Sequence, residues 1–384
     1  MKNLFDAIAC SATGDGGLPN GIYNRQDFFR WERQNLFGHG WFGVAFAADV
    51  PNPGDVQKID LLGLSLILVR TEDGDVKTFY NVCRHRGRQL VDEPCSGVKL
   101  LRCPYHAWTY RLDGQLQGTP HIGGTGVHRV DEFDRSKYGL FEIRNHLWMD
   151  IVFVNLSGTA EEFTRWIEPL ETHLARFWGD RGPGQMRPAS DGIMEVEVAS
   201  NWKLALENFL EAYHLPFVHP GLNSYSPLRE HYCIVSESNF AGQGVTNYQP
   251  NIGTGTPMPT ISTWTEELGH TAEYPALYPN VLIGIQRDHF FTMLLIPLDI
   301  NKTLERVELL FVGDSASDAR YINTRQAILE GWRVVFQEDV AAVEGLQLGR
   351  NVDVFDGGIL TPVLDRSTRH FHRWFARQAD GRAE

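Results

Sequence analysis

The sequence is short of cysteine and has no long hydrophobic run. Five of its 384 residues are cysteine. An odd, sparse set of cysteines without an evident export signal does not suit a disulfide scaffold, so we expect a cytoplasmic protein whose clustered cysteines bind metal. The longest apolar run, Leu61–Val69, is interrupted by Gly63 and Ser65. It is much shorter than the roughly 18 residues of a membrane-spanning helix, so no membrane association is expected.

Positive charge is also in deficit. Lysine and arginine total 35 against 48 aspartate and glutamate residues, which gives a formal net charge of −13. The negative electrostatic field of such a chain disfavours nucleic acid and anionic membranes as partners. It suits a cationic small molecule or a basic redox partner, although net charge alone does not choose between them. The length allows two to three domains or one large one.

The apolar pattern places helices and strands in separate stretches. Helices are expected over residues 24–36, 161–177, 201–214 and 318–348. Short β runs, separated by turn signals, are expected over residues 61–69, 76–82, 100–103, 141–144, 148–155, 193–198, 281–285, 290–298 and 306–312. Pro169 is expected to kink or split the second helix. Two stretches rich in glycine and proline, 181–188 and 251–259, are expected to be a linker and a loop over a site.

The first chemical motif pairs one cysteine with one histidine twice. Cys83-Arg84-His85 and Cys103-Pro104-Tyr105-His106 each follow a β run. A Rieske cluster needs two thiolates on one iron and two neutral imidazoles on the other, and two such loops supply that set.

A structural zinc site with the same four residues is the rival interpretation. The interleaved order and the single-residue gap in Cys83-x-His85 do not match the usual finger spacing. A chance scatter of four core residues is the third interpretation, and the paired spacing argues against it. The remaining cysteines, Cys10, Cys95 and Cys233, have no partner at ligand spacing and are expected to be buried small hydrophobes.

A second motif lies about one hundred residues further on. Asn201 is a candidate N-cap for a helix that is expected to continue to His214. Glu211 and His214 are three residues apart and would share a helical face. Pro216 is expected to stop this helix, so that His219 can point back from the following turn.

Two histidines require one carboxylate to complete a facial iron site that leaves positions open for O₂. Asp339, inside the late helix, is the preferred candidate, and Glu338 is the alternative. Each of these residues taken alone is more often structural or solvated. Their occurrence in one chain with the Cys/His motif favours the metal site.

These motifs resemble those of the α-subunits of Rieske non-haem iron oxygenases, which hydroxylate rings or demethylate their substrates. The resemblance covers nearly the whole chain. It is carried by the stretches 83–87, 103–108, 201–219 and 338–339.

The resemblance implies a role for each motif residue. Cys83, His85, Cys103 and His106 would hold a [2Fe–2S] cluster, and His214, His219 and Asp339 a mononuclear Fe(II). Glu211 would bridge the two centres across a head-to-tail homotrimer, with Asn208 nearby.

The implied fold is α+β in three parts. Residues 1–40 would form a helical segment that packs on the catalytic domain, and residues 41–157 a β-rich Rieske domain. Residues 158–384 would form the catalytic domain, an antiparallel sheet flanked by helices.

Three features depart from the usual family pattern. Ala107 stands where the family usually has glycine, and Glu211 where most members have aspartate. The chain is also shorter than many aromatic-ring α-subunits. In its glutamate at position 211 and in its length, the chain is similar to members that act on quaternary ammonium compounds and work without a β-subunit.

The expected activity is therefore O₂-dependent hydroxylation or N-demethylation of a small molecule, preferably a betaine-like quaternary ammonium compound. The aromatic residues expected near the site are Phe209, Tyr213, Trp264, Tyr274, Tyr278, Phe290 and Phe291. An aromatic-ring substrate and a pure electron-transfer protein are the alternatives. Electrons would come from NAD(P)H through a separate flavin or iron–sulfur reductase, since the chain has no dinucleotide-binding fingerprint. Arg84, Arg86 and Arg88 would dock that reductase or form a merely solvated loop.

Overall fold

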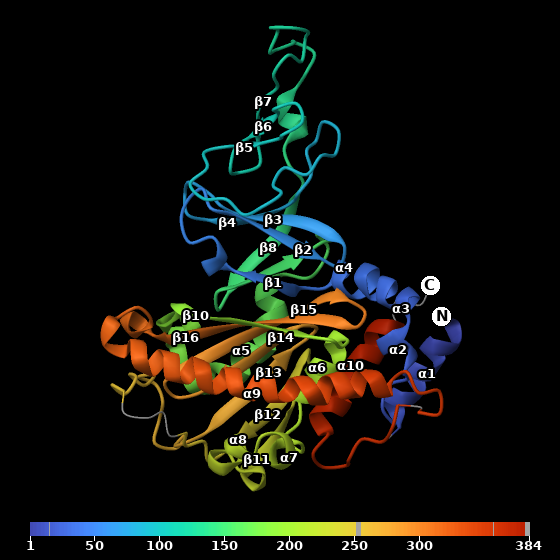
Figure 1. The fold of residues 1–384 in the computed structure, drawn as a ribbon, viewed down its shortest axis with the longest axis vertical. Helices are drawn as coiled ribbons and strands as arrows, with labels where there is room; N and C mark the ends of the chain where they lie inside the picture. Colours follow the sequence, from blue (N-terminus) through green and yellow to red (C-terminus); the bar gives the residue numbers. More distant parts are fainter. Residues whose placement is uncertain (15, 251–254, 356, 381–384) are drawn as a thin grey trace. The chain divides into compact units, whose positions relative to one another are not determined.

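The computed structural model describes residues 1–384 except 15, 251–254, 356 and 381–384. The chain divides into two compact units. The smaller unit is His39–Ala160, and the larger unit joins Met1–Gly38 to Glu161–Glu384. Figure 1 shows the two units in sequence colours.

The smaller unit is built from two antiparallel sheets. Six strands follow the order β1-β9-β8-β4-β3-β2, and three short strands follow the order β5-β6-β7. The bounds are β1 Phe42–Phe46, β2 Val56–Leu61, β3 Leu64–Arg70, β4 Val76–Tyr80, β5 Leu101–Arg102, β6 Thr109–Tyr110, β7 Leu116–Gly118, β8 Glu142–Trp148 and β9 Ile151–Asn155.

The predicted single strand over Leu61–Val69 is wrong. The chain reverses at Leu62 and Gly63, which both have positive φ, and β2 pairs with β3 across this two-residue turn. Positive φ at both central residues gives the turn the twist that a hairpin needs. Gly63 was the visible signal for the reversal.

The larger unit contains a seven-stranded antiparallel sheet of order β10-β16-β15-β14-β13-β12-β11. The bounds are β10 Met186–Val198, β11 His231–Val235, β12 Phe240–Val245, β13 Ala272–Leu277, β14 Val281–Ile285, β15 His289–Asp299 and β16 Lys302–Val312. The sequence pattern missed β11, β12 and β13. Strands β12 and β13 are buried at every position, so they show no polar alternation, and glycine or proline interrupts each.

The predicted linker over residues 181–188 is correct only in its first part. A 3-10 turn covers Gly179–Gln185, and β10 already begins at Met186. An irregularity between Pro188 and Ile193 separates the two paired parts of β10. The expected loop 251–259 lies partly outside the described residues.

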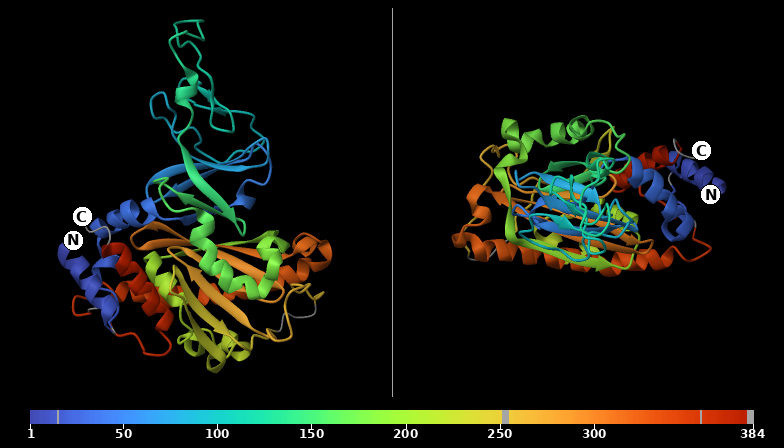
Figure 2. Two further views of the ribbon diagram at one scale, coloured as in Figure 1. Left: turned by 180° about the vertical axis from the view of Figure 1, so that it is seen from behind. Right: turned by 90° about the horizontal axis from the view of Figure 1, so that it is seen from above.

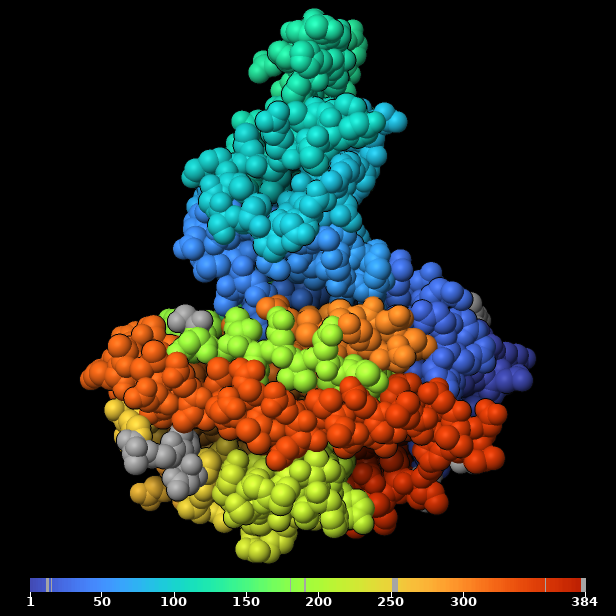
Figure 3. Space-filling model, in the orientation of Figure 1, coloured from blue at the N-terminus to red at the C-terminus, as the bar shows by residue number. Residues whose placement is uncertain are grey.

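Helices cover both faces of the larger sheet. Their bounds are α1 Lys2–Thr13, α2 Gly21–Asn24, α3 Gln26–Trp31, η1 Glu32–Leu36, α4 Phe37–His39, α5 Phe163–Trp178, α6 Trp202–Phe209, α7 Leu215–Val218, α8 Pro220–Tyr225, α9 Ile322–Gly349 and α10 Arg366–Asp380. Helices α5 and α9 lie on opposite faces of the sheet (Figure 2). Helix α9 forms a continuous band on the surface of this unit (Figure 3).

The predicted helices over residues 161–177 and 318–348 are confirmed by α5 and α9. Pro169 lies inside α5 without dividing it. The fold class is α+β with antiparallel sheets flanked by helices, as predicted. Helix α10 was missed, although Phe371, Trp374 and Phe375 have the spacing of a buried helical stripe.

A buried ion pair joins the N-terminal helices to α6. Lys203 Nζ lies 2.6 Å from Glu32 Oε1, and both side chains are fully buried. Removal of one partner would leave an uncompensated charge in the interior, which is strongly destabilising. This pair fixes the N-terminal segment against the helix that leads to the second motif.

The remaining sequence expectations have mixed outcomes. Among the described residues, no helix is both long and apolar enough to cross a membrane. The prediction that the three unmatched cysteines are buried was wrong. Cys10 is exposed, and Cys95 and Cys233 are only partly buried.

We expect the larger unit to lose stability as the pH falls because of His370. Burial lowers the pKa of His370 to about 4, and the ring accepts a hydrogen bond from the Tyr278 hydroxyl or donates one to it. Since the unfolded chain binds more protons between pH 6.5 and 4, the free energy of unfolding decreases through this window. Between pH 7 and pH 5, the free energy of unfolding of His370→Gln should fall by about 1–2 kcal/mol less than that of the wild type. Urea unfolding at pH 7, 6 and 5 measures this, with His270→Gln at an exposed position as the control.

Candidate functional site

The two Cys/His loops of the smaller unit have the same backbone shape. The Cys83 N–H donates to the Arg88 carbonyl, and the Cys103 N–H donates to the Trp108 carbonyl, both at 2.8 Å. Each cysteine carbonyl also accepts from the N–H four residues later, at 3.0 Å. Two turns of one geometry therefore present their side chains in the same way.

The residue that closes each turn has a left-handed backbone. Gly87 has φ of 76° and Ala107, at the corresponding place in the second loop, has φ of 55°. Glycine adopts this region freely, whereas alanine costs roughly 1 kcal/mol. This position explains why glycine is usual there, and the small cost shows that alanine is tolerated.

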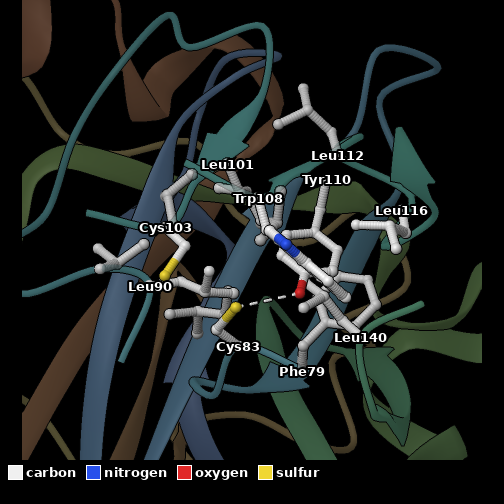
Figure 4. Packing of buried hydrophobic residues seen from close by; sticks show 14 residues of the cluster. Phe79, Cys83, Leu90, Leu101, Cys103, Trp108, Tyr110, Leu112, Leu116 and Leu140 are labelled. Carbon is white, nitrogen blue, oxygen red and sulfur yellow. Dashed lines mark hydrogen bonds between the residues drawn. The ribbon is translucent and has the colours of Figure 1, made fainter. Parts of the chain in front are cut away.

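The cysteines of these loops point inward and the histidines outward. Cys83 and Cys103 are each 2 % exposed and belong to the buried cluster of the unit (Figure 4). Burial raises the pKa of the Cys83 thiol, and the neighbouring Cys103 contributes to this rise. His85 and His106 are exposed, and their ring centroids are 4.6 Å apart.

The separation of the two buried cysteines from the two exposed histidines distinguishes an iron–sulfur cluster site from a zinc site. Among the residues that the structure describes, no three of these four side chains bring ligand atoms to one point. A tetrahedral zinc site requires all four to converge. A two-iron cluster instead takes the sulfur pair at one iron and the imidazole pair at the other. The residues present therefore fit a Rieske cluster.

Tyr110 supports the sulfur of Cys83 and was not singled out by sequence reasoning. Its hydroxyl oxygen accepts from the Arg84 N–H at 3.0 Å, which leaves its proton for the Cys83 Sγ at 3.3 Å (Figure 4). Trp108 stacks on the His85 ring at 4.8 Å. Hydrogen bonds to cluster sulfur raise the reduction potential.

We expect Tyr110→Phe to lower the potential of the cluster. Loss of one hydrogen bond of about 1 kcal/mol corresponds to about 40 mV for a one-electron couple. Redox titration by electron paramagnetic resonance measures this change. Wild type and variant should both give a Rieske-type signal with an average g below that of all-cysteine clusters. An all-cysteine signal, or an unchanged potential, would contradict this account.

The helix of the second motif ends earlier than predicted. Helix α6 stops at Phe209, and Pro216 lies in the first turn of α7. The segment between them is a turn, so Glu211 and His214 do not share a helical face. Their proximity comes from the turn itself. The N-cap role of Asn201 is confirmed by the hydrogen bond that its side chain accepts from the Lys203 N–H at 3.2 Å.

The turn and α9 bring together the three predicted metal-binding side chains. Ligand atoms of His214, His219 and Asp339 all lie within 4.8 Å of one another. His219 Nε2 is 2.9 Å and His214 Nε2 is 3.6 Å from Asp339 Oδ1. Two imidazoles and one carboxylate in this arrangement suit a facial non-haem iron site.

Each histidine of this triad is oriented by a second carboxylate. Glu211 Oε1 lies 2.5 Å from His214 Nδ1, and Glu338 Oε2 lies 2.7 Å from His219 Nδ1. Such carboxylates fix the tautomer and ring orientation of metal-binding histidines. Because Glu338 contacts the far nitrogen of His219, its position suits a support of that ring better than a third ligand.

Asn208 holds the third member of the triad. Its side-chain amide donates to Asp339 Oδ1 at 2.8 Å. The residue is thus near the triad without belonging to it.

A cavity with an empty volume of about 450 Å³ adjoins the triad. Its aromatic lining consists of Phe209, Tyr274, Phe291, Trp332 and Phe336. Among the described residues that line the cavity, none is lysine or arginine.

The comparison with protein families agrees with both halves of the chain. The family "Ring hydroxylating alpha subunit (catalytic domain)" matches residues 186–381, about half of the chain. The "Rieske [2Fe-2S] domain" matches residues 40–133. The chain belongs to the Rieske oxygenase α-subunits.

Individual relatives match either nearly the whole chain or about half of it. The carnitine monooxygenase oxygenase subunit of Escherichia coli (strain K12) is 26% identical over 94% of this chain and 93% of its own. The glycine betaine monooxygenase oxygenase subunit of Chromohalobacter salexigens is 32% identical over 54% of this chain and 44% of its own. The structure of a quaternary ammonium Rieske monooxygenase superposes with a TM-score of 0.80 at 20% identity and 98% coverage of both chains, which shows the fold.

Family membership has direct consequences for the chemistry. The Rieske domain carries a [2Fe–2S] cluster, and the catalytic domain of the family carries mononuclear non-haem iron. This α-subunit is therefore the oxygenase component of an oxidoreductase, and it takes its electrons from a separate reductase.

Three of the seven aromatic residues predicted near the site of this α-subunit line the cavity, namely Phe209, Tyr274 and Phe291. The other four do not line the cavity: Tyr213 is 47 % exposed, Trp264 stacks on Phe177, Tyr278 packs on Trp374 of α10, and Phe290 packs near Trp178 of α5. Adjacent residues of a strand point to opposite faces. Phe290 and Phe291 therefore separate, and only Phe291 faces the cavity.

Trp332 and Phe336 were missed, although a signal was present. They stand seven and three residues before Asp339 on α9, so all three share one helical face. The Trp332 indole N–H donates to His289 Nε2 at 2.9 Å, and His289 Nδ1 lies 2.8 Å from Asp288. These linked hydrogen bonds fix the Trp332 indole against the cavity.

His231 and Gln243 brace the turn that carries Glu211, and they were missed as well. The Gln243 amide donates to the carbonyls of Phe209 and Glu211 at 3.1 and 3.0 Å. His231 Nδ1 lies 2.9 Å from the other atom of this amide, Gln243 Oε1. The two side chains come from β11 and β12, which the sequence pattern did not reveal.

Two of the three arginines near the Rieske loops are already engaged within their own unit. Arg84 donates to the Gly139 carbonyl at 2.6 Å, and Arg88 forms an ion pair with Asp92 at 2.6 Å. A role for these arginines in reductase docking stays a prediction.

Proposed function

We propose that this α-subunit oxidises a small quaternary ammonium compound of the betaine type. Cys83, His85, Cys103 and His106 would hold the cluster, with His214, His219 and Asp339 as the iron ligands. The observation that carries the proposal is the cavity beside the triad, whose walls are aromatic and which has no lysine or arginine in its described lining. When bound, the metal centres supply O₂ activation and the electrons for it.

The cavity walls suit a cation. A quaternary ammonium ion over an aromatic face gains about 0.5–2 kcal/mol per good contact, and it cannot be held by hydrogen bonds of its own. Tyr274, Phe291, Trp332 and Phe336 offer such faces in one cluster, with ring centroids 4.6 to 6.4 Å apart. The net charge of −13 attracts the same kind of substrate. The relatives named above act, by name, on carnitine and glycine betaine.

The proposed reaction is hydroxylation at a carbon attached to nitrogen. One oxygen atom of O₂ enters the C–H bond, and the other leaves as water with two electrons from the reductase and two protons. The C–N bond of the hydroxylated product then breaks to give an amine, an aldehyde and a proton. The role of the protein is to hold the cation against the aromatic wall beside the triad and to exclude bulk water.

Electron delivery is proposed to pass between subunits of a homotrimer, with Glu211 as the bridge from His214 to the cluster ligand His106 of a neighbouring copy. Tyr213 and Phe217, 47 % and 78 % exposed beside this turn, are suitable for a protein contact. We further propose an NAD(P)H-dependent flavin or iron–sulfur reductase as the donor and the cytoplasm as the location.

An aromatic ring compound is the alternative substrate, because aromatic walls also bind flat rings. A pure electron carrier is the weaker alternative, since it would leave the triad and its supports without a role.

The test is O₂ consumption by the metal-loaded protein with a surrogate reductase and NADH. We expect uptake of one O₂ per amine and per aldehyde formed with a betaine or carnitine, and no uptake above background with benzoate or salicylate. Stoichiometric uptake with an aromatic acid, and none with any quaternary ammonium compound, would overturn the proposal.

A further inference from the structure

Two buried side chains near the cavity have unused hydrogen-bonding groups. Tyr274 is 6 % exposed and Gln286 is 1 % exposed. Within the described part of the chain, the Tyr274 hydroxyl and both polar atoms of the Gln286 amide have no hydrogen-bond partner within 3.5 Å, although the two groups lie near enough for the amide to lower the pKa of the phenol. A buried polar group without a partner costs about 1–3 kcal/mol, so such groups call for a functional explanation.

The two side chains lie on the same face of the sheet. Glu273 of β13 pairs with Ile285 of β14, and Tyr274 and Gln286 each follow that pair by one residue. Side chains alternate along a strand, so both point away from the Glu273 side, and they are diagonal neighbours. Phe291, which pairs with Gly284, belongs to the same face.

Of this pair, Tyr274 lines the cavity beside the triad. Gln286 lines a second cavity, whose walls also include Tyr248, Arg287 and Asp288. Burial raises the pKa of Tyr274, with the Gln286 amide acting in the opposite direction, so the hydroxyl keeps its proton and can donate. The amide N–H₂ is a second donor.

We propose that the Tyr274 hydroxyl and the Gln286 amide bind the carboxylate end of a zwitterionic substrate, while the aromatic wall holds its ammonium end. The inference rests on the proposed function and assigns two residues to the carboxylate of its betaine-type substrate. A carboxylate has two oxygens with lone pairs enough to accept from both donors. A site that hydrogen-bonds a substrate group rejects an analogue without it, because the donors stay unpaired.

The preference for a betaine should be measurable as binding. The probes are glycine betaine and propyltrimethylammonium, which has a similar length and lacks the carboxylate. Calorimetric titration of the metal-loaded, full-length protein should give at least tenfold tighter binding of the betaine. Gln286→Leu should weaken betaine binding about tenfold and leave binding of the alkyl cation unchanged. Tyr274→Phe keeps the ring of the cation-binding wall and should weaken betaine binding more than binding of the alkyl cation.

Thr292→Val is the matched control. The Thr292 hydroxyl is also buried and without a partner in the described structure, but Thr292 is next to Phe291 in β15 and therefore faces the other side of the sheet. Its removal should change neither affinity. Iron content and the visible spectrum of the cluster confirm that each variant is intact.

The outcomes separate this inference from the proposed function. Equal affinity of the wild type for both probes, or equal loss of both in Tyr274→Phe and Gln286→Leu, would overturn the carboxylate site and leave the proposed function standing. Absence of binding for both probes would overturn the two together.

Discussion

Asp339→Ala should abolish turnover while the Rieske signal stays intact. The carboxylate is proposed as one of three protein ligands of the mononuclear iron, and its removal leaves two histidines. Loss of a supporting residue alone typically costs 10–100-fold in metal affinity, so loss of a ligand should cost more than about a hundredfold. The cluster loops belong to the other unit of the chain. Iron analysis measures the metal content, electron paramagnetic resonance measures the Rieske signal, and O₂ uptake measures turnover.

Glu338→Ala is the informative comparison because Glu338 is the neighbour of Asp339 and touches the same histidine. We expect this variant to retain iron with about 10–100-fold weaker affinity and to keep part of its activity. If Glu338→Ala loses iron and Asp339→Ala keeps both iron and activity, the ligand assignment is wrong by one residue.

Glu211→Gln should keep both metals and slow electron transfer between them strongly. Glu211 Oε1 accepts the His214 ring N–H at 2.5 Å, and Oε2 accepts the backbone N–H of His214 at 3.3 Å. A carboxylate can accept further bonds at each oxygen, whereas an amide has only one acceptor atom and turns two N–H donors toward its neighbours. The bridge to a second subunit would therefore lose its charge and one acceptor.

Single-turnover experiments measure this effect. With the cluster reduced beforehand, the variant should remain reduced after O₂ and substrate are added, whereas the wild type should oxidise rapidly. Glu344→Gln is the control, because Glu344 accepts from the Ala199 N–H, and an amide oxygen can replace that acceptor. Cluster oxidation at the wild-type rate in Glu211→Gln would remove this residue from the path. Loss of the mononuclear iron would instead indicate a direct ligand.

The metal motifs were readable from the sequence because their geometry is local. Cys83 and His85, and Cys103 and His106, each lie within one closed turn whose hydrogen bonds span six residues. Helix α9 was also readable, since one long amphipathic stretch carries Asp339. The pairing of the two loops rested on the ligand set that a Rieske cluster needs, and the choice of Asp339 on the carboxylate that a facial iron site needs, since no local rule connects residues that far apart.

The end of α6 was not readable in the same way. The residues after Phe209 have good helical propensity, and only the following proline marked a limit. Helix α6 ends earlier because the side-chain amide of Gln243, from a neighbouring strand, donates hydrogen bonds to the carbonyls of Phe209 and Glu211. Tertiary hydrogen bonds overrode local preference at the segment that carries the proposed bridge.

The sequence by itself determined which residue types could form the two proposed donor sets, and its family resemblance predicted the α+β class and the oxygenase chemistry, which the comparisons confirm. Only the tertiary structure decided that Glu338 supports His219, that Tyr110 faces the Cys83 sulfur, and which aromatic rings surround the cavity. These features depend on the register between strands far apart in the chain. A shift of one residue turns a side chain to the other face of the sheet. That register placed Tyr274 and Gln286 on one face of the sheet, where no spacing in the sequence could have joined them.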